Sequence, residues 1–165
     1  MGRVRFVIVA TAVVAAGCQP AAQPTLTEQQ RTAIVDSVRT VANELATWMS
    51  SQGVGRPFAS FFDSTAAVVV AADGRIVASS FDSVASRYRS WTPPAGASLT
   101  WDSLRVEALA PGLAHFTGAF KESFTPPSGP AYEGHGVMSA VVVRRPAGWV
   151  FAAQHTSVVP QPGGR

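Results

Sequence analysis

The sequence predicts an α+β domain, in which a long N-terminal helix and two shorter helices combine with antiparallel strands. Three observations predict this class. Apolar residues recur at helical spacing near the N-terminus, a hairpin signal follows, and four long strand-like segments with short connections fill the second half of the chain. The chain has 165 residues, of which 47% are hydrophobic and 14% charged. This length and composition suit one domain with a substantial core.

Residues 1–17 are predicted to form a signal peptide. Arg3 and Arg5 precede an apolar run that is shorter than the roughly 20 residues a membrane-spanning helix needs. Small residues then lead directly into Cys18, the only cysteine. This junction resembles the bacterial lipobox, whose cysteine is lipidated, although Ala15 stands where that motif has Leu.

The lipobox resemblance implies that Cys18 carries the lipid and that residues 18–27, with two prolines and no charge, are a flexible tether. We therefore expect a lipoprotein of the bacterial cell envelope that faces the periplasm. Gln19 after the cysteine favours the outer over the inner membrane. The alternative is a plain secreted protein cleaved after an Ala-x-Ala site at 10–12. With a single cysteine, no disulfide is expected within the domain.

Residues 28–52 are predicted to form one amphipathic helix. Thr27 and Gln30 have capping-box spacing, and Gly53 marks the end. The apolar positions that form one stripe are Ile34, Val38, Val41, Leu45 and Trp48.

Shorter elements are predicted next. Pro57 opens a short helix over 58–62, and Asp73-Gly74 joins two strands, 66–71 and 75–78, as a hairpin. Apolar residues at helical spacing predict a third helix over 81–91, which Pro93-Pro94 ends.

The rest of the chain is predicted to be antiparallel sheet, over 99–109, 113–124, 133–144 and 149–159. The last strands are apolar on both faces, which requires both faces to be covered. The helices can cover one face only. We therefore expect the second face to pack against another copy of the chain in a homodimer.

The order of these elements resembles the nuclear transport factor 2-like superfamily, in particular its SnoaL-like branch, over residues 28–160. The residues that carry the resemblance are Phe61-Phe62-Asp63, Asp73-Gly74 and the closing Gly148-Trp149-Val150-Phe151 with Gln154-His155-Thr156-Ser157. The resemblance implies a cone-shaped, strongly curved sheet wrapped on the long helix, as in the cystatin-like roll. It also implies a pocket between sheet and helices and a dimer through the outer sheet face. Residues 161–165 are expected to be a disordered tail.

This fold hosts isomerases, cyclases, dehydratases, ligand binders and interaction modules, so it does not determine an activity. The candidate residues have to be considered one by one.

The three histidines, His115, His135 and His155, lie on three predicted strands. A metal site is not favoured, because no pair of them has a spacing that orients two ligands. His155 has the strand parity of Trp149 and Phe151, which predicts an imidazole in the pocket that could act as acid or base. The alternative is a structural histidine that satisfies a backbone group. Ser157 is not expected to act as its nucleophile, because the turn that such enzymes use is missing.

An enzyme of the isomerase type would need a carboxylate base and a donor such as tyrosine. Asp63 and Glu133 are the carboxylates that we expect to act with His155 in that case, and Asp102 and Glu122 are further possible bases. The two tyrosines, Tyr88 and Tyr132, lie outside the long helix, which weakens the enzyme hypothesis. Asp63 could instead cap the turn after the short helix.

The predicted function is binding of a small apolar or ring-containing ligand, as a membrane-anchored homodimer and without established catalysis. The predicted lining of the pocket is Trp48, Phe62, Trp91, Trp149, Phe151 and His155. An isomerase, cyclase or dehydratase without cofactor, and a protein–protein interaction module, are the alternatives. No metal or cofactor is expected. Nucleic-acid binding is not expected either, because the arginines are scattered and cleavage before Cys18 would leave a formal charge of only +1.

Overall fold

The computed structural model describes residues 25–65 and 67–160. The predicted signal peptide 1–17, Cys18, the predicted tether up to residue 24 and the predicted tail 161–165 lie outside the described residues. In the described part, no helix is both long and apolar enough to cross a membrane.

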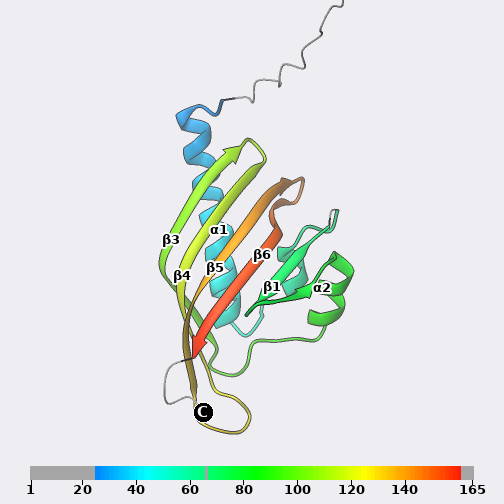
Figure 1. Ribbon diagram of the computed structural model, residues 1–165, viewed down its shortest axis with the longest axis vertical. Helices are drawn as coiled ribbons and strands as arrows, with labels where there is room; N and C mark the ends of the chain where they lie inside the picture. The colour runs from blue at the N-terminus through cyan, green and yellow to red at the C-terminus, as the bar shows by residue number, and fades with distance from the viewer. Residues whose placement is uncertain (1–24, 66, 161–165) are drawn as a thin grey trace, which may run out of the picture.

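The domain combines one long helix, a short 3-10 helix and a second α-helix with one sheet (Figure 1). The elements are α1 (Glu28–Ser50), η1 (Phe58–Phe61), β1 (Val69–Ala72), β2 (Arg75–Ala78), α2 (Phe81–Tyr88), β3 (Ser98–Ala110), β4 (Leu113–Phe124), β5 (Tyr132–Arg145) and β6 (Gly148–Pro160). The predicted α+β class and the predicted order of elements are confirmed.

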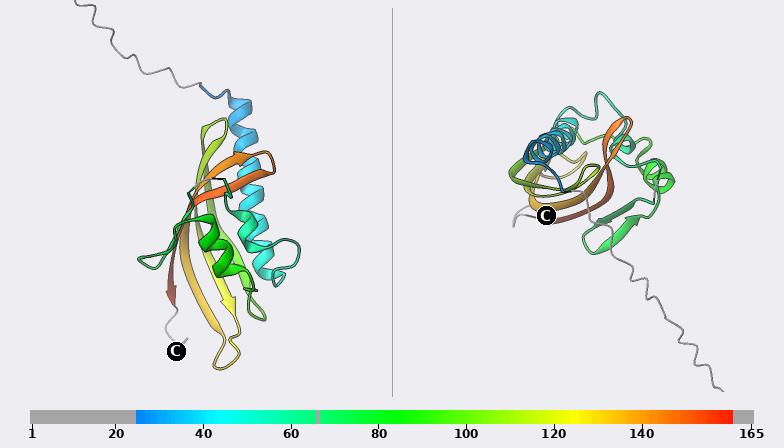
Figure 2. Two further views of the ribbon diagram at one scale, coloured as in Figure 1. Left: turned by 90° about the vertical axis from the view of Figure 1, so that its right-hand side faces the viewer. Right: turned by 90° about the horizontal axis from the view of Figure 1, so that it is seen from above.

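The sheet has six strands in the order β2-β1-β6-β5-β4-β3. Its neighbouring strands are antiparallel except β1 and β6, which are parallel, so the sheet is mixed rather than purely antiparallel. Short turns in the sequence reveal only how consecutive strands pair, and β1 and β6 are far apart in the chain. The sheet is strongly curved and wraps partway around α1 (Figure 2). We call the side toward α1 the concave face and the other side the outer face.

Helix α1 begins where the sequence predicts and ends at Ser50, two residues before the predicted end. Thr27 and Gln30 form a reciprocal capping box, with the backbone N–H of each bonded to the side chain of the other. At the other end, Gly53 adopts a φ of +81°, and a Cβ there would lie 3.0 Å from the Trp48 ring. A side chain at Gly53 would therefore disturb the close of the helix.

Three glycines on the concave face lie beneath aromatic rings. A Cβ on Gly118 would lie 2.7 Å from the ring of Trp101, and one on Gly136 would lie 2.8 Å from that of Phe120. Gly134 has the same relation to Tyr132. The missing side chains leave room for these rings against the sheet.

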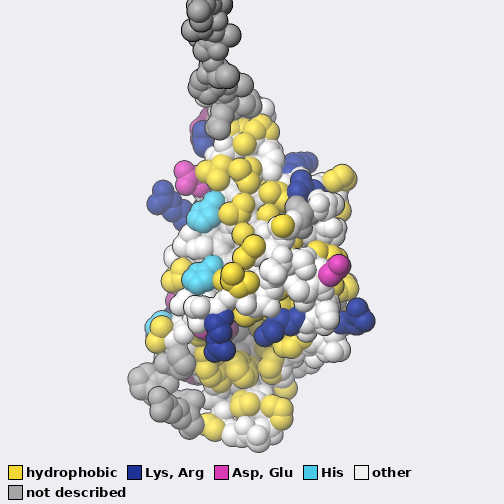
Figure 3. Space-filling view, turned by 45° about the vertical axis from the view of Figure 1, so that its right-hand side comes forward, with side chains coloured by type: hydrophobic (Ala, Val, Ile, Leu, Met, Phe, Trp, Pro, Cys, Tyr) yellow, Lys and Arg dark blue, Asp and Glu magenta, His cyan; other side chains and the backbone are white. Residues whose placement is uncertain are grey.

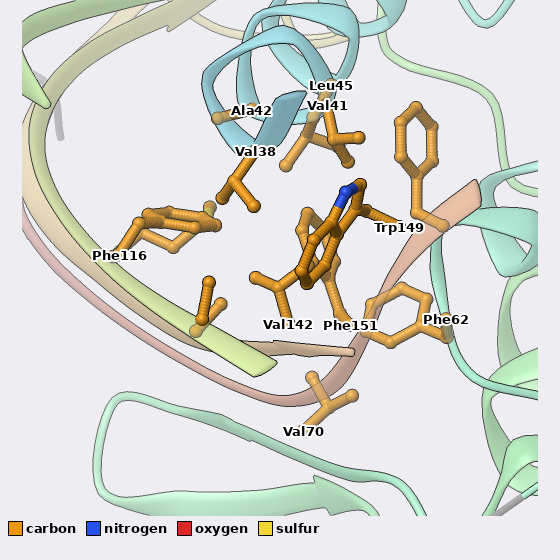
Figure 4. Close-up of a cluster of buried hydrophobic side chains, with 14 of the residues drawn as sticks. Val38, Val41, Ala42, Leu45, Phe62, Val70, Phe116, Val142, Trp149 and Phe151 are labelled. Atoms are coloured by element: carbon orange, nitrogen blue, oxygen red, sulfur yellow. The ribbon is translucent and has the colours of Figure 1, made fainter. Parts of the chain in front are cut away.

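The core lies between α1 and the concave face. Val38, Val41 and Leu45 of α1 point toward the sheet residues Phe116, Val142, Trp149 and Phe151 (Figure 4). Trp101 Nε1 donates to the Ala42 carbonyl at 3.2 Å and so ties β3 to the middle of α1.

Candidate functional site

A β-bulge in β6 decides which of its side chains enter the cone. Val142 pairs with Phe151, but the next pair is Val141 with Ala153, so Ala152 is an extra residue on β6. The alternation of β6 side chains between the two faces therefore shifts by one residue at this point, from odd to even positions on the concave face. Trp149 and Phe151 before the bulge share the concave face with Gln154 and Thr156 after it.

The prediction that His155 shares the face of Trp149 and Phe151 is wrong for this reason. His155 pairs with Ser139, lies on the outer face and is exposed, whereas Gln154 is only 9% exposed. Parity counting assumes strict alternation, and an inserted residue reverses it.

All three histidines lie on the outer face. His115 pairs with Val141 of β5, and His135 pairs with Val159 of β6. They appear on one side of the molecule in the space-filling view (Figure 3). Within residues 25–65 and 67–160, no group of three or more His, Cys, Asp or Glu side chains could hold a metal ion.

Gln154 is a polar side chain in an apolar part of the cone. Its amide nitrogen donates to Thr156 Oγ1 at 3.1 Å and lies 3.6 Å from Met138 Sδ, while Oε1 has no hydrogen-bond partner. Its strand neighbours, Ala140 and Val70, offer no side-chain partner. Exchanging the amide O and N would still leave one end without a partner.

Most of the predicted pocket aromatics are buried in the core. Trp48, Phe62, Trp149 and Phe151 are each at most 7% exposed. Phe62 and Phe151 pack edge to face at 5.6 Å. These side chains fill the closed part of the cone and do not line an open pocket.

Trp91, at 36% exposed, is the exception among the predicted pocket residues. It packs with Trp48, Phe58 and Tyr88 at centroid distances of 5.4 to 5.7 Å. These four rings form an aromatic cluster where α1 ends.

Asp63 forms a buried ion pair instead of a free base. Its carboxylate, at 0% exposure, accepts hydrogen bonds from Arg145 Nε at 3.1 and 3.2 Å and from Thr65. The Arg145 hydrogen bonds, against the effect of burial, lower the pKa of Asp63 to about 2. The capping role that the sequence suggested as an alternative therefore fits the geometry.

The predicted combination of His155, Asp63 and Glu133 does not come together. Glu133 is exposed at the start of β5, whereas the partner of Asp63, Arg145, ends that strand, about 40 Å further along it at about 3.3 Å per residue. His155 lies on the outer face.

The structure instead brings Glu122 and Tyr132 together on the concave face. Glu122 lies opposite Gly134, and the Tyr132 side chain leans over this glycine toward the carboxylate. A Cβ at Gly134 would lie 2.5 Å from the hydroxyl oxygen. The Tyr132 ring also stacks on Phe124 at 4.6 Å.

Burial raises the pKa of Glu122, although the Tyr132 hydrogen bond opposes this, and the charge of Asp73 raises it further. The pKa of Tyr132 is raised by burial and by the nearby Glu122 carboxylate. The pair is therefore a carboxylate and a phenol placed for proton transfer. Both residues can be named from the sequence, but their pairing cannot, because only the cross-strand register brings them together.

Several hollows lie outside the cone, and two of them bear on the candidate residues. One, of about 480 Å³, lies between α1 and the segment 51–61. The other, of about 260 Å³, lies on the outer face, where His115 and His155 join mainly apolar side chains.

Comparison with known proteins supports the fold. Neither a protein-family model nor a curated protein matches the chain. Solved structures do match. A proposed scytalone dehydratase from Novosphingobium aromaticivorans has a TM-score of 0.69 at 12% identity, over 84% of this chain and 99% of that one.

Two further structures are similar. The hexachlorocyclohexane dehydrochlorinase LinA-type3 from Novosphingobium barchaimii has a TM-score of 0.65 at 14% identity, over 83% of this chain and 96% of that one. A nuclear transport factor 2-like protein from Salmonella enterica has a TM-score of 0.64 at 12% identity, over 81% and 97%. The TM-scores establish the fold alone, which is nuclear transport factor 2-like as the sequence resemblance implied.

Proposed function

We propose that this nuclear transport factor 2-like domain binds a small, mainly apolar molecule on its concave face, with the Gln154 amide as the polar anchor. The observation that carries the proposal is the buried amide oxygen without a partner. We further propose that the lipid on Cys18 holds the protein at the cell envelope as a homodimer.

An unsatisfied buried amide is costly, because it loses its hydrogen bonds to water and gains none in return. Leucine would fill similar space at Gln154 without this cost. A ligand that supplies the missing hydrogen bond would offset this cost and so explain an amide at this position.

The surroundings of Gln154 indicate the class of ligand. Met138, Ala140 and Val70, each at most 5% exposed, surround it with apolar side chains, and the methionine side chain can adapt its shape to make room for a ligand. We therefore expect a ligand with an apolar body and one hydroxyl, amine or carbonyl group. Among the similar structures, the dehydrochlorinases are named for hexachlorocyclohexane, an apolar ring compound, which agrees in kind.

The test begins with native mass spectrometry of the protein taken from its own envelope, to identify a retained molecule. Gln154→Leu should then lose that molecule while its melting temperature stays equal or rises. His155→Leu, one residue away on the outer face, is the matched control and should retain it. Equal retention by both variants would contradict the proposal.

A second candidate function, acid–base catalysis, is favoured by the Glu122–Tyr132 pair. A carboxylate with a raised pKa beside a phenol can remove a proton from carbon while the phenol donates a hydrogen bond. If the retained molecule is a substrate, Glu122 should catalyse the exchange of one C–H hydrogen of that molecule with solvent.

Incubation in D₂O followed by mass spectrometry of the molecule checks this. Glu122→Gln should abolish the exchange, and Tyr132→Phe should slow it, while both variants still bind. Exchange that persists in Glu122→Gln would exclude this pair as the proton acceptor.

A further inference from the structure

The end of α1 and the segment that follows it form a groove of about 480 Å³, away from the concave face. Thr40, Asn43, Glu44 and Thr47 line it from the helix, and Val54 and Arg56 line it from the returning segment. The groove therefore has polar and apolar walls and a single cation among its lining residues.

Arg56 is fixed in place before any ligand binds. Its guanidinium lies 3.7 Å over the ring of Phe61, and Nη2 donates to the Ser60 carbonyl at 3.2 Å. Its own carbonyl accepts a hydrogen bond from Trp48 Nε1 at 2.6 Å. Little side-chain freedom remains to be lost when an anion binds.

The hydrogen-bonding capacity of this guanidinium is only partly used. Nε is buried and has no partner, and Nη1 lies 3.5 Å from Glu44, a contact too long for a good hydrogen bond. Glu44 is half exposed, so water can replace it readily. Burial also lowers the pKa of Arg56, against the opposing effect of Glu44.

We infer that this groove binds a small carboxylate with an apolar tail, whose carboxylate replaces Glu44 on the Arg56 guanidinium. The tail lies along Val54, which is 76% exposed, and along the methyl groups of the lining threonines. A planar guanidinium with free N–H groups matches a carboxylate better than a point charge would. This site is separate from the one proposed around Gln154.

Octanoate is a suitable probe, with 1-octanol and octylamine as its neutral and cationic counterparts. The mature chain carrying Cys18→Ser is titrated with each probe and followed by NMR. The indole N–H of Trp48 reports on the groove, because it donates to the Arg56 carbonyl. The indole N–H of Trp149 reports on the cone.

We expect octanoate to shift the Trp48 signal and leave the Trp149 signal in place. We expect octanol and octylamine to leave the Trp48 signal in place. Arg56→Gln should weaken octanoate binding at least about tenfold, the effect of losing one charge-assisted hydrogen bond. Glu44→Gln should strengthen octanoate binding about threefold, because the substitution removes the competing carboxylate. The half-exposed position of Glu44 lets the fold tolerate this change.

Equal binding of octanol, or no gain in Glu44→Gln, would overturn the inference. So would an octanoate shift confined to Trp149. Because the Gln154 proposal depends on Gln154→Leu and on a retained molecule, either proposal can fail without the other.

Discussion

Asp63 connects two distant parts of the chain. Its carboxylate binds Arg145, 82 residues further along the chain, and its backbone N–H donates to the Phe151 carbonyl at 2.9 Å. One residue therefore fixes the segment after η1 to the turn between β5 and β6. A buried carboxylate held this way contributes stability only while it is ionised.

Asp63→Asn should lower the free energy of unfolding by about 2–3 kcal/mol at pH 7, because it leaves Arg145 without its charge partner. The pKa of Asp63 is about 2 in the folded state, below its unfolded value of about 3.9. The stabilisation is therefore complete above about pH 4 and is lost as the pH falls toward 2. Urea denaturation of both proteins from pH 7 to pH 2 measures this.

The difference between wild type and Asp63→Asn should shrink over that interval. Asp102→Asn is the control, since Asp102 pairs with Lys121 at the surface and its loss should cost less than about 1 kcal/mol. A constant difference at every pH would show that Asp63 acts through packing alone.

Gly134 keeps the Tyr132 hydroxyl on Glu122. Gly134→Ala should displace the hydroxyl, because the new Cβ would lie 2.5 Å from it. Without the hydroxyl near the carboxylate, which lowers the pKa of Glu122, that pKa should rise further. Carbon-13 NMR titration of the Glu122 carboxyl measures the change.

Gly112→Ala is the matched control, because a Cβ there has its nearest described neighbour at 3.9 Å. It should leave the Glu122 titration unchanged. An unchanged titration in Gly134→Ala would mean that the phenol does not set this pKa.

At the scale of elements, the features that depend on neighbours in the chain could be predicted from the sequence. The apolar stripe and capping box of α1, the Asp73-Gly74 turn and the long strands all follow from local spacing. The parallel pairing of β1 with β6 and the bulge at Ala152 could not be predicted, because both depend on register across the sheet. Because of the bulge, Gln154 and not His155 lies on the concave face.

The start of helix α2 depends on a capping interaction between residues three positions apart. Ser80 and Ser83 form a reciprocal capping box at its start. Ser80→Ala should lower the free energy of unfolding by about 1 kcal/mol, since an N–H at the helix end loses its acceptor. Ser79→Ala should have less effect, and chemical denaturation of both variants tests the difference.

At the scale of the whole molecule, the outer face of the sheet is the surface that would bring two copies together. Val137 and Val159 are 47% and 54% exposed there, and Val69 is also exposed. Apolar side chains gathered on one sheet face are typical of an interface. This agrees with the homodimer proposed from the sequence.

Val137→Glu should turn a dimer into a monomer, because it places a charge in that interface. Sedimentation velocity of the mature chain at micromolar concentration measures the state of both proteins. Val54→Glu, beyond the end of α1 and 76% exposed, is the control outside the sheet and should leave the dimer intact. A monomeric wild type would contradict the proposal.

The parallel pairing of β1 with β6 has a consequence for the timing of folding. The Asp73 carboxylate accepts a hydrogen bond from the Val158 N–H, 85 residues further along the chain. Contacts between such distant segments form slowly and only after the last strand is available. A chain that emerges from a translocation channel with its N-terminus first cannot close this sheet until nearly all of it has crossed. For a protein with the predicted signal peptide, the topology itself would delay folding until export is almost complete.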